Sequence, residues 1–371
     1  MTIHQFAFPT WIHFGPGARK LVAEHLKERG CLRPLIVTDK GIAGLPLLSE
    51  FQSLIPHSQV YSGVQGNPVA SQVAEGAKAY KHHGADSVIG FGGGAALDVA
   101  KVVALMATHP GEVLEYAWDH PQVRPIEGEL PHFVALPTTA GTGSEVGRAS
   151  VISEDDTHVK RIIFSPRILA KAVFADPELT LGLPGPITAA TGMDALTHNI
   201  ESYLSPAYHP LCDGIALEGV RIVARALPLA FKNGKDLQAR ADMLMGSMMG
   251  AIAFQKDLGA VHSCAHALST VCDLHHGLAN ALMIDHVMRF NRPAAEAKMA
   301  ELARVAGVPD LIEWLVALKQ QLGIPSKLKP LGVKPEHLPR LVEIALADLC
   351  HKTNPRPCTR ADFERLFQES I

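Results

Sequence analysis

The sequence predicts an amino-terminal α/β domain with a parallel sheet, followed by an all-α carboxy-terminal domain. In the first half of the chain, short apolar β-branched runs alternate with amphipathic helical patterns, as in a parallel sheet covered by helices on both faces. From about Pro184, strand-like runs are absent and Ala, Leu, Met and Glu fill amphipathic helical segments. The turn GLPGP at 182–186 marks the boundary, so we expect domains at 1–182 and 183–371.

Three strand-like runs in the first half end in polar or glycine-rich segments. Residues 33–39 (RPLIVTD) form the first run and residues 85–94 (ADSVIGFGGG) the second, with a helical stretch at about 70–83 between them. A second helix follows the glycines over 96–107, and residues 132–145 (HFVALPTTAGTGSE) run from the third strand into a loop. Both loops are expected at the carboxyl edge of the sheet, where open α/β sheets bind nucleotides.

Composition and charge exclude several classes of protein. The 371 residues are 47% hydrophobic and 19% charged, with a formal net charge of −3, which is ordinary for a globular chain. No Lys/Arg-rich run indicates a nucleic-acid or membrane-surface partner, and no window is long enough to span a bilayer. The start lacks the pattern of a signal peptide, and the six scattered cysteines indicate reduced thiols, so we expect a cytoplasmic protein.

The segment GFGGGAALDVAK (90–101) is a candidate diphosphate site. It follows a strand and opens a helix, where amide N–H groups can bind phosphate and glycines allow close approach. It matches neither GxGxxG nor a Walker A loop, so an ordinary βα turn is the alternative for this segment alone. The threonine-rich loop at 138–145 strengthens the case for a dinucleotide. Asp39 could bond an adenosine ribose and favour NAD over NADP, or equally cap a helix or turn.

Apolar helical segments of the second half carry three pairs of candidate metal ligands. The pairs are Asp194 with His198, His262 with His266, and His275 with His276. A spacing of four residues puts both side chains on one helix face. A lone buried histidine is usually a satisfied core residue, but each member of this set would need its own buried partner. One carboxylate with several imidazoles favours Fe²⁺ or Zn²⁺ over Mg²⁺ or Ca²⁺. Spacing alone decides neither between His275 and His276 nor whether His266 is a ligand or a neighbour.

Together these motifs resemble the iron-dependent (group III) alcohol dehydrogenases, which have the dehydroquinate synthase-like fold. The resemblance runs nearly from end to end of the chain. Its motifs are FPTWIHFGPGA (8–18), GNP (66–68), GGGAALDVAK (92–101), PTTAGTGSEV (137–146), ATGMDALTHNIESY (190–203), LGAVHSCAHAL (258–268), HHGLANAL (275–282) and TNPRP (353–357).

The resemblance implies roles for particular residues. The ligands that it implies for Fe²⁺, with Zn²⁺ as the alternative metal, are Asp194, His198, His262 and His276. It places His266 near the nicotinamide as a catalytic residue, and leaves His275 outside the ligand set. The residues that it implies for NAD binding are Asp39, Asn67, Gly93, Gly94, Ala95, Asp98, Thr138, Thr139, Thr142 and Lys160. Two positions depart from the family: Ala95 replaces a usual serine and removes a hydroxyl donor to the diphosphate, and Gly147 replaces a frequent threonine.

The implied activity is a metal-dependent alcohol dehydrogenase or aldehyde reductase. It would transfer a hydride between NAD(H) and a small primary alcohol, diol or hydroxy acid and its aldehyde, in a homodimer or larger homo-oligomer. Alternatives within the fold are glycerol dehydrogenase, 4-hydroxybutyrate dehydrogenase and maleylacetate reductase. The four candidate ligands favour the iron group over enzymes with three ligands or none. Alternatives of another class are a metal-dependent hydrolase, which would need no nucleotide, and a structural protein with a vestigial site.

Overall fold

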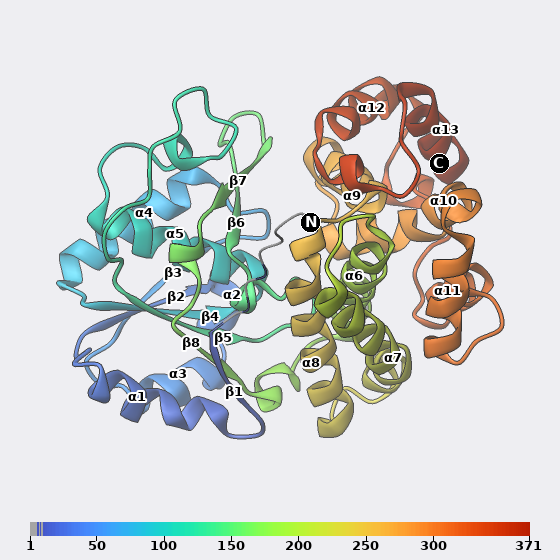
Figure 1. Ribbon diagram of the computed structural model, residues 1–371. Helices are drawn as coiled ribbons and strands as arrows, with labels where there is room; N and C mark the ends of the chain where they lie inside the picture. Colours follow the sequence, from blue (N-terminus) through green and yellow to red (C-terminus); the bar gives the residue numbers. More distant parts are fainter. Residues whose placement is uncertain (1–5, 7, 9) are drawn as a thin grey trace. The chain divides into compact units, whose positions relative to one another are not determined.

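The computed structural model describes residues 6, 8 and 10–371, so the start of the predicted domain 1–182 lies outside the described residues. The chain forms two compact units (Figure 1). The α/β unit contains the described residues 10–139 and the segment Gly143–Thr180. The helical unit consists mainly of Leu181–Ile371, together with Ala140–Thr142. None of the helices in the described residues is long and apolar enough to cross a membrane.

A six-stranded parallel sheet organises the α/β unit, in the strand order β1-β8-β5-β4-β2-β3. Its strands are β1 (Trp11–Phe14), β2 (Pro34–Asp39), β3 (Gln59–Val64), β4 (Ser87–Gly92), β5 (His132–Pro137) and β8 (Ala172–Ala175). A separate antiparallel hairpin consists of β6 (Ala149–Ser153) and β7 (Lys160–Phe164). The three predicted strands are confirmed as β2, β4 and β5, whereas β1, β3, β8 and the hairpin were not predicted.

Helices cover both faces of the sheet, as the alternation of elements predicted (Figure 1). On one face, α1 (Val22–Glu28) and α3 (Pro46–Ser53) pack against side chains that include Ile89 and Phe91 of β4. Gly90 lies between these two residues and points the other way, where a Cβ would lie 2.9 Å from Leu97 of α5 (Gly94–Thr108). Helix α4 (Ala70–His83) packs beside α5, and the short α2 (Lys40–Ala43) follows β2. Residue 90 is therefore glycine because α5 comes this close to the sheet.

The strand order reverses beside β2. The chain passes from β2 to β3 on one side, while β4 lies on the other side of β2. In an open parallel sheet, such a reversal leaves a crevice at the carboxyl ends of the strands, where ligands bind. Asp39 ends β2 and Gly93 directly follows β4, so two of the predicted cofactor residues lie at this reversal.

The helical unit is built around α6. Its helices are α6 (Gly185–Leu204), α7 (Pro210–Lys232), α8 (Leu237–Ala253), α9 (Ala260–Cys272), α10 (His276–Ala306), α11 (Leu311–Gln321), α12 (Leu338–Ala347) and α13 (Arg360–Ser370). Helix α6 packs against α7, α8 and α10, and most of its residues are buried. A helix covered on all sides must bury its polar side chains too, so Asp194, His198 and Glu201 of α6 each require a partner.

Candidate metal centre

Four of the predicted side chains converge inside the helical unit. Asp194 and His198 lie one turn apart on α6, His262 lies in the first turn of α9, and His276 is the first residue of α10. Asp194 Oδ1 is 3.4 Å from Nε2 of His276 and 3.9 Å from Nε2 of both His198 and His262. One ligand atom from each of the four residues lies within 4.8 Å of the others. The structure therefore brings together all four predicted ligands.

The spacing and chemistry of this donor set fit one divalent transition metal. Donor atoms about 2.0–2.1 Å from a tetrahedral ion are about 3.4 Å apart, close to the separations found here. Burial lowers the pKa of His198 to about 4, against a partial upward effect of Asp194, so at neutral pH its imidazole keeps a lone pair. Three imidazole nitrogens with one carboxylate suit Fe²⁺ or Zn²⁺ better than the hard ions Mg²⁺ and Ca²⁺.

Asn280 lies among the four residues and was not predicted. Its Nδ2 donates to Asp194 Oδ1 at 2.7 Å and is 3.2 Å from Nε2 of His276 and 3.3 Å from Nε2 of His262. Asn280 follows His276 by one turn of α10 and is fully buried. The four-residue spacing within HGLAN was the signal that could have identified it.

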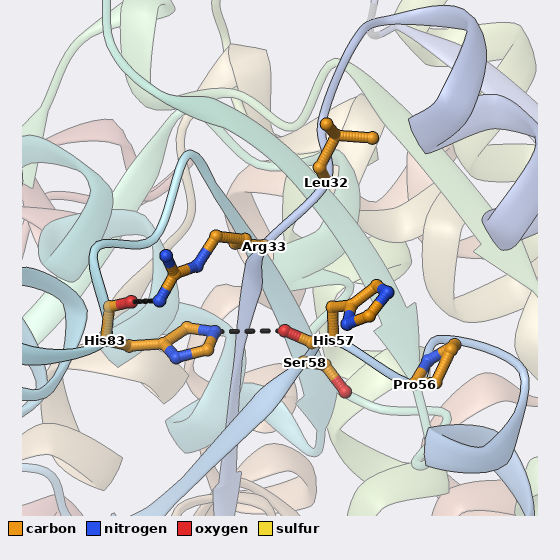
Figure 2. A pocket seen from close by; sticks show the side chains of 6 residues that line it. All are labelled: Leu32, Arg33, Pro56, His57, Ser58 and His83. Atoms are coloured by element: carbon orange, nitrogen blue, oxygen red, sulfur yellow. Dashed lines mark hydrogen bonds between the residues drawn. The ribbon is translucent and has the colours of Figure 1, made fainter.

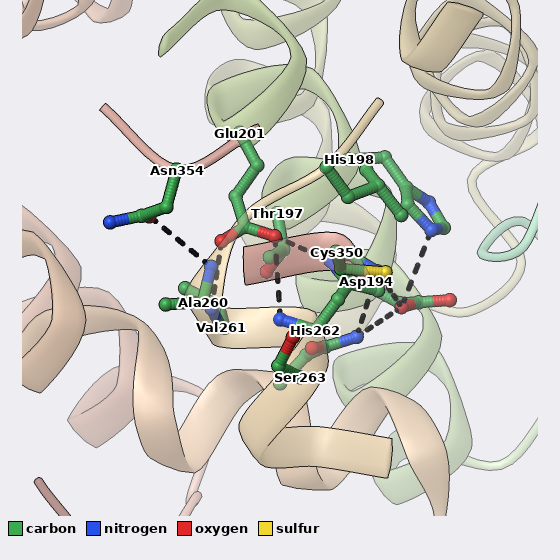
Figure 3. A network of polar contacts seen from close by, with 12 residues as sticks. Asp194, Thr197, His198, Glu201, Ala260, Val261, His262, Ser263, Cys350 and Asn354 are labelled. Atoms are coloured by element: carbon green, nitrogen blue, oxygen red, sulfur yellow. Dashed lines mark hydrogen bonds and ion pairs between the residues drawn. The ribbon is translucent and has the colours of Figure 1, made fainter. Parts of the chain in front are cut away.

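Glu201 is a second residue that the sequence analysis missed. It lies on α6 one turn beyond His198 and is 2% exposed. Figure 3 shows its carboxylate directed at the start of α9, where Oε2 is 2.6 Å from Nδ1 of His262 and Oε1 accepts from the backbone amide of Val261 at 2.8 Å. The spacing of three residues after His198 placed Glu201 on the ligand face of α6.

His266 lies beside the cluster and is hydrogen-bonded to a separate carboxylate, that of Asp348. Its ring stacks on that of His276, with centroids 5.3 Å apart and an interplanar angle of 20°. Its Nδ1 is 2.8 Å from Oδ2 of Asp348, whose Oδ1 accepts from Ser263 Oγ at 2.7 Å and from the Cys350 amide at 2.9 Å. Burial raises the pKa of Asp348, but His266, Ser263 and the Cys350 amide outweigh it and hold that pKa below its ordinary value.

His266, Asp348 and Cys350 also bring potential ligand atoms within 4.8 Å of one another. Both oxygens of Asp348 already accept hydrogen bonds. Burial and the nearby carboxylate of Asp348 raise the pKa of the Cys350 thiol well above its ordinary value. Because the thiolate is the form that binds metals, this group is a poor candidate for a second metal site.

The glycine and threonine loops meet at the carboxyl edge of the sheet. Gly93 is the N-cap of α5, and Gly94 and Ala95 form the first turn of that helix. A Cβ on Gly93 would lie 3.2 Å from Cγ2 of Thr139, and the Thr138 amide donates to the Gly92 carbonyl at 3.0 Å. Asp39 caps α2 by accepting from the Ile42 amide at 2.9 Å, which is one of the two roles considered for it.

The remaining predicted cofactor residues are Asp98, Asn67, Lys160 and Thr142. Asp98 joins α5 to β6, because Oδ1 accepts from Ser144 Oγ at 2.5 Å and Oδ2 accepts from the Val151 amide at 3.0 Å. Lys160 begins β7 opposite Ser153, whose amide donates to the Pro68 carbonyl at 2.8 Å and so brings the segment after β3, with Asn67, to the hairpin. Thr142 belongs to the helical unit.

A pocket lies at the opposite, amino-terminal end of β2 and β3 (Figure 2). It is lined by Leu32, Arg33, Pro56, His57, Ser58 and His83. The Arg33 guanidinium donates to the His83 carbonyl, and Nε2 of His83 lies 3.1 Å from the His57 carbonyl oxygen. These groups bond to each other, and none of the predicted site residues lies here.

The sequence of this chain matches one protein family in two parts. Iron-containing alcohol dehydrogenase matches residues 9–177, and the C-terminal part of the Fe-containing alcohol dehydrogenase family matches residues 188–371. The chain belongs to the iron-containing alcohol dehydrogenase family. It is therefore an oxidoreductase acting on CH–OH groups, an alcohol dehydrogenase or aldehyde reductase, as predicted.

Individual relatives agree with this assignment over their full lengths. The 4-hydroxybutyrate dehydrogenase of Cupriavidus necator is 38% identical over 98% of both chains. The crystal structure of 1,3-propanediol oxidoreductase has a TM-score of 0.94 and 34% identity over 100% of both chains. The sulfoacetaldehyde reductase of Bifidobacterium kashiwanohense, solved in complex with NAD⁺, has a TM-score of 0.90 and 27% identity, covering 100% of this chain and 99% of that one. The predicted fold class is confirmed.

Proposed function

We propose that this member of the family uses Fe²⁺, with Zn²⁺ as the alternative metal, and NAD(H) to interconvert a small primary alcohol, diol or hydroxy acid and its aldehyde. The observation that carries the proposal is the gathering of three imidazole Nε2 atoms within 3.4 to 3.9 Å of one oxygen of Asp194. In this proposal residues 183–371 hold the metal and residues 1–182 bind the cofactor, in a cytoplasmic homodimer or larger homo-oligomer.

The proposed metal ligands are Asp194, His198, His262 and His276. When bound there, a divalent metal supplies Lewis acidity, which lowers the pKa of an alcohol and polarises the carbonyl of an aldehyde. Asn280 holds the Asp194 carboxylate in place by donating to its Oδ1. His266 takes up the hydroxyl proton during oxidation, because its Nδ1–H is directed at Asp348 and its Nε2 retains the lone pair.

The proposed cofactor site lies at the reversal of strand order. The first amides of α5, beginning at Gly93 and Gly94, bind the diphosphate together with the Thr138 and Thr139 loop. Ala95 adds no hydroxyl, so backbone amides carry a larger share of that contact. The Asp39 carboxylate bonds the adenosine ribose and repels a 2′-phosphate, which favours NAD over NADP. A relative solved with NAD⁺ supports this choice of cofactor.

A spectrophotometric panel tests the proposal. Protein loaded anaerobically with Fe²⁺ or Zn²⁺ is assayed with 4-hydroxybutyrate, 1,3-propanediol and other small alcohols, and with aldehydes, against NAD(H) and NADP(H). We expect an absorbance change at the reduced-nicotinamide band with NAD(H), and a smaller one with NADP(H). The isosteric variant Asp194→Asn is expected to lose both bound metal and activity because it removes the only charged ligand. Metal-loaded protein that oxidises no alcohol and reduces no aldehyde would contradict the proposal.

A further inference from the structure

The amino end of α9 has an unusual arrangement. Helices commonly begin with a residue whose side chain accepts from the first free amides. Here the N-cap is Gly259, which has no side chain, and the acceptors come from other segments. Glu201 Oε1 accepts from the Val261 amide at 2.8 Å, and Asn354 Oδ1 accepts from the Ala260 amide at 3.2 Å (Figure 3). A carboxylate at a helix amino terminus is also stabilised by the helix dipole.

The same carboxylate reaches the metal cluster. Its second oxygen, Oε2, lies 2.6 Å from Nδ1 of His262, and both side chains are at most 2% exposed. A carboxylate only accepts hydrogen bonds, so Nδ1 of His262 carries the hydrogen. Nε2 of His262 therefore keeps its lone pair, and it is this atom that lies 3.9 Å from Asp194 Oδ1.

We propose that Glu201 positions His262 for metal binding while it closes the amino end of α9. The inference rests on the proposed function, since it concerns a ligand of the same site. Glu201 fixes the tautomer and the ring direction of His262, and its charge makes Nε2 a stronger donor. Replacing a carboxylate that accepts a hydrogen bond from a metal-binding histidine typically weakens metal affinity by about 10- to 100-fold.

The identity of Gly259 follows from this arrangement. A Cβ at position 259 would lie 2.5 Å from Glu201 Oε1 and 3.0 Å from Asn354 Oδ1. Any larger residue would displace the carboxylate that holds His262. Position 259 thus affects the metal site although its backbone lies outside the ligand set.

The test compares two variants of the network with one control. Glu201→Gln keeps the shape of the side chain but replaces one acceptor oxygen by an NH₂ donor. The glutamine side chain therefore cannot accept hydrogen bonds from both Val261 and His262, as the carboxylate does. Gly259→Ala pushes against the carboxylate from the other side. The control, Asn354→Ala, removes the bond to Ala260, together with those to Asn291 and the Arg356 carbonyl, but keeps the pair of Glu201 and His262.

The readouts are the dissociation constants of Zn²⁺ and Co²⁺ by competition with a chelator, the visible spectrum of the Co²⁺ form, and the melting temperature of the metal-free protein. We expect Glu201→Gln and Gly259→Ala to weaken metal binding by about 10- to 100-fold and to alter the Co²⁺ spectrum. Asn354→Ala should lower the melting temperature of the metal-free protein while its metal affinity stays within about threefold of wild type.

Wild-type affinity and spectrum in both Glu201→Gln and Gly259→Ala would overturn the inference. Equal losses of affinity in all three variants would also overturn it, because they would show that any weakening of the start of α9 releases the metal. If the wild-type protein itself bound neither Zn²⁺, Co²⁺ nor Fe²⁺, the proposed function would fail first. The two failures are therefore distinguishable.

Discussion

At the scale of single residues, two carboxylates each fix one histidine ring. Glu201 bonds Nδ1 of His262, and Asp348 bonds Nδ1 of His266. In each pair the other carboxylate oxygen accepts from a backbone amide, so the carboxylate itself is anchored. The pairs differ in what Nε2 can do, because Nε2 of His262 faces Asp194 whereas His266 lies outside the ligand set. In the proposed function, one pair therefore serves metal binding and the other proton transfer.

Replacing Asp348 by Asn should lower kcat by about 100-fold while bound metal stays at the wild-type level. An asparagine amide can donate to Nδ1 of His266, which moves the ring hydrogen to Nε2 and removes the proton acceptor. Steady-state kinetics and metal analysis of the same samples measure both effects. The matched control is Ser263→Ala, which removes the hydroxyl bonded to Asp348 but keeps the charge, and its kcat should fall by no more than about tenfold. Loss of metal from the Asp348→Asn protein would contradict the assignment.

Helical spacing indicated candidate pairs of ligands, but only the resemblance to the iron-dependent alcohol dehydrogenases favoured His276 over His275 and set His266 apart. Asp194 and His198 are four residues apart, and so are His276 and the unpredicted Asn280. No local pattern connects His266 with Asp348, which is 82 residues further along the chain. Such a pair is created by packing α9 against the segment after α12, so the structure was required to find it.

At the scale of elements, the longer strands buried on both faces were predictable, whereas the edge strands and one short inner strand were not. Nearly all residues of β2 and β4 are buried, which gives continuous apolar runs. Strand β3 lies at one edge of the sheet and is only half-buried, so it carries a polar sequence without clear alternation. Strand β8 has only four residues, which is too short for a periodic pattern.

The contact between α1 and β5 should make stability depend on pH. Nε2 of His25 and Nε2 of His132 lie 2.9 Å apart, an arrangement that requires at least one neutral ring. Burial lowers the pKa of both residues, to about 4 for His132, and nearby His13, Arg29 and Lys171 act in the same direction while Glu28 opposes it. Since the folded pKa is below the ordinary value of 6.5, this contribution is complete above pH 6.5 and is lost as the pH falls toward 4.

Replacing His132 by Gln should therefore reduce the fall in melting temperature between pH 7 and pH 5 relative to wild type. Thermal scans at fixed metal content measure this slope, and the comparison of variants cancels the titration of the metal ligands. His57→Gln is the control, because His57 is exposed and lies outside this contact. The prediction is wrong if His132→Gln and His57→Gln show the same pH dependence as wild type.

At the scale of the whole molecule, the two units contain different sets of candidate site residues. Each is matched by its own part of the family description, and each contains a coherent set of candidate residues. The proposed metal ligands all belong to the helical unit, whereas the glycine loop and Asp39 belong to the α/β unit. A ligand that binds the native state stabilises the part of the protein that binds it. Each ligand is therefore expected to protect the helices and strands of its own site from hydrogen exchange.

Hydrogen exchange should separate the two binding events. Zn²⁺ at 100 times its Kd is expected to slow exchange in α6, α9 and the start of α10 by up to about 100-fold, corresponding to about 2.7 kcal/mol. NAD⁺ should slow exchange at the start of α5 and after β2. In Asp194→Asn the protection by Zn²⁺ should disappear while the protection by NAD⁺ remains. Protection of α9 by NAD⁺ alone, or loss of both effects in the variant, would contradict this division.

The four proposed metal ligands differ in burial, so one side of the site is more open to solvent than the others. The side chains of Asp194, His198 and His262 are at most 5% exposed, whereas that of His276 is 22% exposed. His276 is also the first residue of α10, and helix ends fray far more readily than a buried helix such as α6 opens. An ion is therefore expected to enter and leave past His276, so the mobility of one helix end sets how quickly one metal replaces another during the life of the protein.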